Sequence, residues 1–341
     1  MKDWMLLLPI LIPVSGALLV FLMPKDSRAL QRVLAMLFSA AALGMTIILY
    51  GRQMAFNLAW AGFGIDFNLK LDSFSSFIIL VAAFTFLTVL YSVIYMDKNR
   101  RERLFYGFTL LTSAFVSGAM LADNLVVMLF FWEGLLGLLF GMIMVNGNKA
   151  SSTAIKALII NGTADLCLIF GVGITFWQAG SLDMGAINLP LKDFWPSLAY
   201  ILMMIGAIAK AGSMPFHSWI PDAATDAPLP FLAFIPAALD KILGIYLLAR
   251  LNLSIFLMLP GSNLSLAVMV IGACTIILAV MMALIQKDYK KLLGYHAISQ
   301  VGYMILGIGT ALPIGIVGGI FHMINNALYK SCLFFTAGSV E

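Results

Sequence analysis

Seven charged side chains lie inside stretches of the sequence that are otherwise apolar. A charge at the centre of a bilayer costs roughly 2.5 to 3.5 kcal/mol on insertion scales, so it is retained where it pairs or meets water. A lysine taken out of water gives up its proton more readily, and a nearby carboxylate restores the charged form. Because a row of such groups can pass protons, the sequence predicts an ionisable path through Glu133, Lys156, Lys210, Lys241 and Lys330, with Asp165 and Asp240 as supporting residues.

One of these lysines stands beside a predicted break in its helix. The segment at 207–230 reads AIAKAGSMPFHSWIPDAATDAPLP and contains Lys210, Pro215 and His217. Because proline has no amide proton, Pro215 cannot bond to the carbonyl of Ala211, and a break is predicted just after Lys210. Non-helical backbone at membrane depth is tolerated only within protein or beside water. The segment therefore predicts a polar pocket that holds Lys210, with Pro215 and His217 as supporting residues.

A second proline precedes an acid–base pair in the run FIPAALDKILGIYLLAR at 234–250. Pro236 comes before the adjacent residues Asp240 and Lys241. Neighbouring side chains point about 100° apart on a helix, so the two are expected to face different partners.

The last apolar run, FHMINNALYKSCLFF, carries a polar stripe. His322, Asn326 and Lys330 follow one another at four-residue steps and therefore lie on one helix face. Each step is about 6 Å, which a bridging water can span. Histidine titrates near neutral pH without further tuning, so the stripe predicts a continuation of the proton path.

The elements that position these residues are membrane helices. The 341 residues are 62% hydrophobic and 11% charged, which excludes an ordinary soluble domain. Apolar runs of about 20 residues predict an all-α integral membrane protein of about eleven helices, centred near 13, 40, 84, 112, 134, 165, 206, 239, 275, 301 and 326. The first run is too long for a secretory signal and lacks a cleavage site, so it is expected to be a membrane helix.

The links between these helices predict the orientation. With the N-terminus outside, eleven basic residues fall on the inner links and five on the outer side. The inner ones are Lys25, Arg28, Arg32, Lys98, Arg100, Arg101, Arg103, Lys149, Lys287, Lys290 and Lys291, and the outer ones are Lys2, Arg52, Lys70, Lys192 and Arg250. The excess of positive charge inside predicts an N-terminus outside.

Motifs for other chemistry are absent from the sequence. Its three cysteines stand apart, and it contains no Walker loop, convincing dinucleotide fingerprint, CxxC, CxxCH or HExxH pattern. We therefore expect no cofactor, no metal and no redox chemistry in this chain. The net charge of +4 is explained by the inner links, so nucleic-acid binding is not expected.

The ordered motifs resemble those of the antiporter-like membrane subunits of respiratory complex I, energy-converting hydrogenases and Mrp-type cation/proton antiporters. The resemblance covers nearly the whole chain. The motifs that carry it are LDSFSSFIILV with YSVIYM (71–96), FFWEG (130–134), KAGSMPFHSWIPDA with APLP (210–230), ALIQKDYKKLLGYHAISQVGYM (283–304) and FHMINNALYK ending in AGSV (321–340).

The resemblance implies a half-channel module built from inverted repeats. It matches Glu133 to a helix 5 glutamate that pairs with the helix 7 lysine, here Lys210. It also implies a hydrated axis at mid-membrane that continues through Lys241, His322 and Lys330, and it places Lys156 in a family pattern of helix 6.

The chain departs from the family pattern at several positions. Gly162 stands where an arginine is usual, Pro236 replaces a frequent histidine, and Asn326 replaces a second histidine, so water would carry more of the relay. Family members usually have about fourteen helices. From the resemblance we expect the chain to be a fragment, the product of a split gene, or a short subunit that borrows a half-channel from a neighbour.

The repeat pattern predicts three parts. These are N-terminal helices at 1–96, a first antiporter-like repeat at 97–250 and an incomplete second repeat at 251–341. AIKALII around Lys156 and LYKSCLF around Lys330 occupy corresponding places in the two repeats.

Three functional hypotheses remain open. The first is a proton- or sodium-translocating subunit of a redox-driven complex, with a redox module and related membrane subunits as partners. The second is a subunit of an Mrp-type antiporter without a redox partner. The third is a membrane scaffold that conducts nothing. In each case we expect the chain to lie in the lipid bilayer of an energy-transducing membrane, with a prokaryotic cytoplasmic membrane as the expected location.

Overall fold

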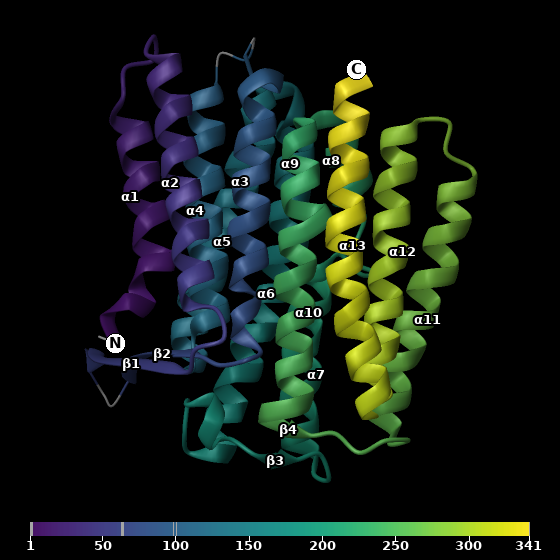
Figure 1. Cartoon of the computed structure of the whole chain (residues 1–341). Coiled ribbons are helices and arrows are strands. Elements are labelled where there is room, and N and C mark those ends of the chain that lie inside the picture. The colour runs from purple at the N-terminus through teal and green to yellow at the C-terminus, as the bar shows by residue number, and fades with distance from the viewer. Residues whose placement is uncertain (1–2, 63–64, 98, 100, 341) are drawn as a thin grey trace. The chain divides into compact units, whose positions relative to one another are not determined.

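The computed structural model describes residues 3–62, 65–97, 99 and 101–340 (Figure 1). Three of the predicted surface cations lie outside the described residues, namely Lys2, Lys98 and Arg100. The chain divides into two compact units, Met1–Lys149 and Ala150–Glu341. The predicted boundaries after residues 96 and 250 rest on the repeat pattern and stay a prediction.

The first unit consists of five long helices and one hairpin. Its helices are α1 (Leu8–Leu22), α2 (Arg28–Leu49), α3 (Ile78–Tyr95), α4 (Glu102–Leu121) and α5 (Leu125–Ile143). A 3₁₀ turn at Asp3–Leu7 leads into α1. Asn124 caps α5, since its side-chain oxygen accepts a hydrogen bond from the amide of Val126 at 2.9 Å.

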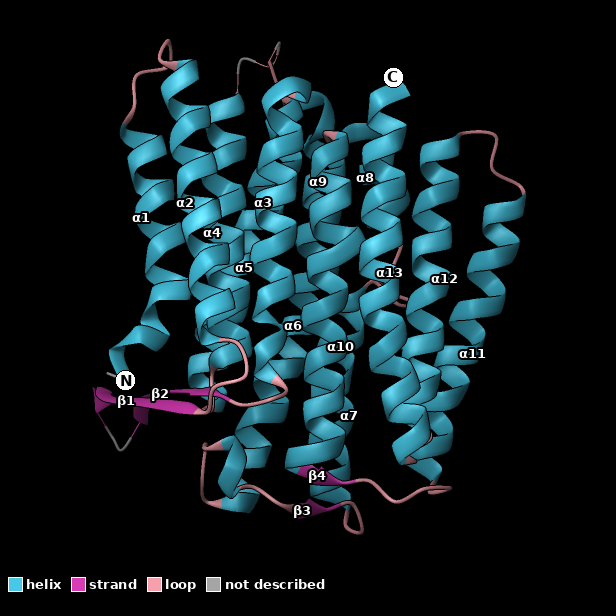
Figure 2. Cartoon of the chain, in the orientation of Figure 1, coloured by secondary structure: helices cyan, strands magenta, loops and turns pink. Residues whose placement is uncertain are grey.

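The strands β1 (Met54–Gly62) and β2 (Ile65–Leu71) form a hairpin between two of the predicted membrane helices, where no strand was predicted (Figure 2). The strands pair antiparallel, with Met54 opposite Leu71. Residues 65–71, IDFNLKL, alternate strictly between apolar and polar, which is the period of a strand with one buried face. The sequence therefore contains the alternating pattern of β2, although no strand was predicted there.

The second unit contains the remaining helices and one very short pair of strands. The helices are α6 (Ser151–Ala179), α7 (Phe194–Ala211), α8 (Trp219–Asp226), α9 (Leu229–Phe234), α10 (Asp240–Arg250), α11 (Asn263–Leu284), α12 (Tyr289–Gly309) and α13 (Pro313–Val340). Five-residue π-helical segments at Ile235–Leu239 and Leu251–Ile255 follow α9 and α10. The strands β3 (Leu189–Pro190) and β4 (Phe256–Leu257) pair in parallel.

The predicted all-α membrane architecture is confirmed. Among the described residues, nine helical segments are long and apolar enough to cross a membrane. They coincide with the predicted runs up to the one centred near 275, and α12 and α13 are long helices at the predicted centres near 301 and 326. The total of eleven membrane spans stays a prediction.

Glycines allow α11 and α12 to pack with their backbones in contact. A Cβ atom added at Gly302 would lie 2.5 Å from the carbonyl oxygen of Gly272, and one added at Gly272 would lie 2.7 Å from that of Gly302. Small residues at such a crossing are typical of membrane helices, where close van der Waals packing replaces the hydrophobic effect.

Candidate ion-conducting site

Lys210 is buried in the last turn of α7, with 2% of its surface exposed. The helix ends at Ala211 because Gly212 adopts a positive φ of 81°, which glycine adopts without strain. The amides of Gly212 and Ser213 bond to the carbonyls of Ala209 and Ile208 at 2.9 Å. The lysine thus lies at a helix C-terminus, whose partial negative charge stabilises a cation.

The interruption after Lys210 has a different cause from the one predicted. Gly212 ends α7 three residues before Pro215 is reached, and helical structure resumes at Trp219 in α8. Two of the carbonyls at the helix end, those of Ile208 and Ala209, are bonded to backbone amides.

Lys241 is fully buried at the start of α10 and donates a hydrogen bond to the carbonyl oxygen of Pro236. Pro236 lies in the first π-helical segment, where the amide of Asp240 bonds to the carbonyl of Ile235 five residues earlier. Single π-helical turns are rare and occur frequently at functional sites.

The helix α13 bonds to the same π-helical segment and to the end of α9. Asn326 donates to the carbonyl of Ala237 at 3.4 Å, and Ser331 donates to the carbonyl of Ala233 at 2.6 Å. Both donors are buried. Side chains on α10 and α13 therefore satisfy two carbonyls of the π-helical segment and one at the end of α9, as irregular backbone within a membrane requires.

Charged side chains from four helices interact with one another in the second unit. Asp240 interacts electrostatically with Lys210 on α7, Lys241 on α10 and Asp165 on α6. Lys330 on α13 interacts with Lys241. Asp165, Lys210, Asp240, Lys241 and Lys330 thus form one connected group, which we call the charge cluster.

A glycine brings α10 close to α7 beside the charge cluster. A Cβ atom added at Gly244 would lie 2.5 Å from the carbonyl oxygen of Ala207 and 2.6 Å from the amide nitrogen of Ala211. Gly244 is one helical turn after Asp240, and Ala211 follows Lys210. The close crossing therefore holds Asp240 and Lys210 in the same part of the unit.

Lys330 interacts with His296, which is not among the predicted path residues. Its ammonium group is buried without a hydrogen-bond partner among the described residues and lies 5.6 Å from the ring centroid of Tyr329. His296 on α12 interacts electrostatically with Lys330. Its place in the motif GYHAISQ was visible in the sequence, but no spacing within α12 linked it to a lysine on α13.

The predicted stripe on α13 faces two different neighbours. His322 is half-buried, and its Nε2 lies 2.9 Å from Oε1 of Gln300 on α12. Its ring packs edge-on against Tyr303, with centroids 5.7 Å apart. Asn326 bonds to the π-helical segment instead. A relay along the stripe from His322 to Lys330 therefore stays a prediction.

Lys156 differs from the other three lysines in its burial. Its side chain is 40% exposed, and its ammonium group lies 2.7 Å from Oδ2 of Asp222 on α8 and 3.0 Å from the carbonyl of Ser218. His217 interacts electrostatically with Lys156, and its ring lies 6.4 Å from that of Tyr295. Lys156 falls in the second turn of α6, which explains why it is less buried than the charge cluster.

Glu133 lies in α5 of the first unit and is half-buried. Its pairing with Lys210 stays a prediction from the resemblance.

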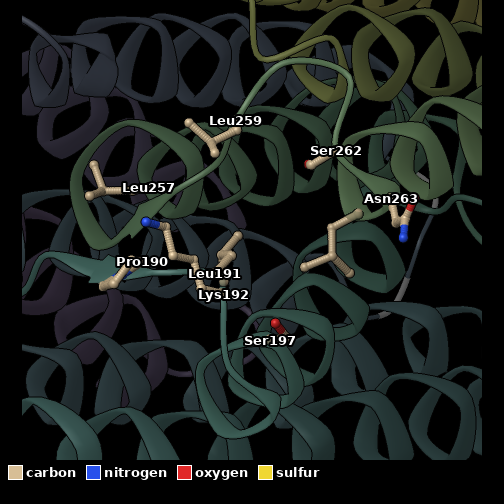
Figure 3. A pocket seen from close by; sticks show the side chains of 9 residues that line it. Pro190, Leu191, Lys192, Ser197, Leu257, Leu259, Ser262 and Asn263 are labelled. Carbon is tan, nitrogen blue, oxygen red and sulfur yellow. The ribbon is translucent and has the colours of Figure 1, made fainter.

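A cavity at another place in the second unit lacks the predicted site residues. It has a volume of about 520 Å³ and lies between the loop around Lys192 and the start of α11 (Figure 3). Leucines and one lysine dominate its lining. Among the described residues, no group of three or more His, Cys, Asp or Glu side chains is placed to hold a metal ion.

The architecture and the charge cluster define an antiporter-like membrane subunit. Residues 122–341 match the family described as NADH:quinone oxidoreductase/Mrp antiporter, transmembrane, and the chain belongs to that family. The resemblance inferred from the motifs is thereby confirmed.

Individual relatives include subunits of two quinone oxidoreductases. The chain is 32% identical over 293 residues to NADH-quinone oxidoreductase subunit L of Pseudomonas aeruginosa, covering 83% of this chain and 46% of the relative. It is 30% identical over 366 residues to the chloroplastic NAD(P)H-quinone oxidoreductase subunit 5 of Phaseolus vulgaris, covering 99% and 48%. The chain thus spans about half the length of these curated relatives.

A solved structure shows the same fold. A chain in the Mrp complex from Dietzia sp. DQ12-45-1b is 26% identical and superposes with a TM-score of 0.88, covering 98% of this chain and 37% of that one.

Proposed function

We propose that this chain is an ion-translocating subunit of a larger membrane complex and that it moves protons through the charge cluster. The observation that supports this most directly is the convergence of Asp165, Lys210, Asp240, Lys241 and Lys330 within one unit. Five ionisable groups at the core of a membrane protein are costly, and such groups mark ion paths because structural stability alone is achieved more cheaply by apolar residues.

The cluster moves a proton by changing which lysine is charged. When Asp240 is ionised it stabilises the ammonium forms of Lys210 and Lys241 on either side, and when it is protonated it releases them. The carbonyl of Pro236 accepts a hydrogen bond from Lys241 and leaves its positive charge unneutralised. Repulsion between Lys241 and Lys330 then drives the proton onward.

The groups around Lys156 provide a connection to the surface. The half-exposed pair Lys156–Asp222 is accessible to water, and His217 interacts electrostatically with Lys156. His217 contacts Tyr295, the neighbour of His296, which in turn interacts with Lys330. This order leads from the start of α6 to α13 without requiring a metal or an organic cofactor.

The parent complex is proposed to be redox-driven. The quinone oxidoreductase subunits among the relatives support this, and other membrane subunits with a redox module would then be the partners. The similarity to a chain of an Mrp complex supports the alternative, a cation/proton antiporter with no redox partner. Adjacent genes separate the two, since quinone-reductase or hydrogenase genes indicate the first and an antiporter operon the second.

Ion flux in reconstituted vesicles tests the proposal. The complete parent complex is placed in liposomes with a pH-sensitive dye inside, and the Asp240→Asn variant is compared with wild type and with Asp193→Asn at the exposed start of α7. An amide neither binds nor releases a proton, so Asp240→Asn should lower proton flux at least about ten-fold while Asp193→Asn has no effect. A complex that conducts nothing in its wild-type form would support the scaffold hypothesis, and sodium-dependent flux would assign sodium as the ion.

A further inference from the structure

A pocket in the first unit is lined by charged residues, none of which belongs to the proposed proton path. It has a volume of about 370 Å³ and lies where α1 ends and where α2 and α4 begin. Its lining contains four cations and one carboxylate, and the residues are Lys25, Arg28, Gln31, Arg101, Glu102, Arg103 and Leu104. The lining therefore carries a surplus of three positive charges.

The arginines of this basic pocket are held by backbone carbonyls. Arg103 donates to the carbonyl of Met23, Arg101 to that of Met144 and Arg28 to that of Asp97, each at 2.9 Å. A carbonyl orients a guanidinium group without neutralising its charge. The arginine side chains are therefore ordered before any ligand binds. Binding of an anion then costs little further side-chain entropy, which favours an anion site.

The single carboxylate of the lining is engaged at the floor of the pocket. Glu102 is 2% exposed, and its oxygens lie 2.8 Å from Arg32 and 3.4 Å from Arg28. Arg32 also pairs with Asp97 at 2.6 Å. Lys25, Arg101 and Arg103 have no carboxylate partner among the described residues, and they remain available to a ligand.

The helices that carry the basic pocket are apolar on their exposed sides. Leu18 and Leu22 are exposed on α1, and Leu30 and Val33 are exposed in the first turns of α2. Along their helices, these four residues are one to three turns from the residues that line the pocket. A cationic pocket next to an exposed aliphatic surface matches a molecule with an anionic head and hydrocarbon tails.

We propose that this basic pocket binds the phosphate group of an anionic phospholipid, with its acyl chains against the exposed leucines of α1 and α2. Basic pockets between membrane helices bind the head groups of anionic lipids, and each basic residue near the surface contributes about 1 kcal/mol. The predicted orientation places the pocket at the inner leaflet, where such lipids attract basic segments.

Native mass spectrometry of the purified complex tests this proposal. The complex is titrated with phosphatidylglycerol or phosphatidylcholine, and lipid retention is compared between wild type and Lys25→Gln. We expect wild type to retain phosphatidylglycerol preferentially and Lys25→Gln to weaken that retention about five-fold, with a larger loss for Lys25→Glu. Lys149→Gln is the matched control, because it removes one exposed lysine from the same predicted side outside the pocket.

Three outcomes would overturn the proposal. The first is equal retention of the two lipids. The second is an equal loss of phosphatidylglycerol in Lys25→Gln and Lys149→Gln, which would indicate a diffuse surface charge. The third is complete displacement of the lipid by inorganic phosphate at matched ionic strength, which would assign the pocket to a free anion. Proton flux in Lys25→Gln at saturating lipid separates this site from the proton path, since we expect it to be unchanged.

Discussion

Lys241 donates its hydrogen bond to the carbonyl oxygen of Pro236, five residues earlier in the same helical segment, and not to the adjacent Asp240. This contact joins the irregular backbone of the second unit to its buried charges. Because the acceptor is a neutral carbonyl, Lys241 can lose its proton without leaving an unpaired anion behind. Asp240 interacts electrostatically with Lys241 and Lys210 and can therefore respond to the charge of both.

The first prediction concerns the bond between α13 and α9. Ser331→Ala removes the donor to the carbonyl of Ala233 and leaves a buried oxygen unsatisfied. We expect the variant to be destabilised by about 1 kcal/mol, the size of a hydrogen bond between membrane helices. Thermal unfolding in detergent measures the change. Ser339→Ala, which removes an exposed bond within α13, should leave the melting temperature unchanged, and equal shifts in both variants would contradict this account.

The second prediction concerns the crossing of α7 and α10. Gly244→Ala places a Cβ atom against the backbone at Ala207 and Ala211, so the helices must separate. Overpacking of this kind costs about 2 kcal/mol, and the separation should weaken the interaction of Asp240 with Lys210 and lower ion flux. Gly173→Ala on α6 is the control, since an added Cβ atom there has no neighbour within 4 Å. Normal flux in Gly244→Ala would show that the close approach is not needed.

The third prediction concerns the buried carboxylate of the first unit. Glu102→Gln removes the negative charge that Arg28 and Arg32 share. We expect a loss of about 2 kcal/mol in stability, below the usual cost of breaking a buried pair because Asp97 still contacts Arg32. Denaturation in detergent, followed by circular dichroism, measures this loss. Asp26→Asn, at an exposed site in the α1–α2 link, should be neutral.

The fourth prediction concerns the histidine that the structure adds to the path. His296→Phe keeps an aromatic ring on α12 but removes the titratable group beside Lys330. We expect proton flux to fall about ten-fold, the lower range for loss of a proton-transfer group, with little change in stability. Tyr303→Phe, which alters a hydroxyl on the same helix, should keep its flux. Unchanged flux in His296→Phe would remove this residue from the proposed route.

Some features of the fold could be predicted from the sequence because the signals for them are local. Apolar runs predict membrane helices, and Pro215 predicts an interruption after Lys210, although Gly212 ends α7 three residues before it. The alternation in IDFNLKL is an equally local signal for β2, although no strand was predicted there.

Other parts depend on which helices meet and could not be derived from one sequence. The bonds from Asn326 and Ser331 to carbonyls near Pro236 join residues 89 and 98 positions apart. The spacing of Asp240 and Lys241 predicted different partners, but it could not predict that charged groups on α6, α7 and α13 would interact with them. Lys156 was counted with the buried lysines although its place near the start of α6 leaves it half-exposed.

Lys210→Ala in the intact parent complex tests the central claim most directly, with electron transfer and proton translocation measured in the same vesicles. The variant removes the buried cation at the end of α7 from its interaction with Asp240. We expect electron transfer to continue in part while coupled proton translocation is lost, and Lys192→Ala on the surface to behave as wild type. Proton translocation at the wild-type ratio in Lys210→Ala would contradict the account.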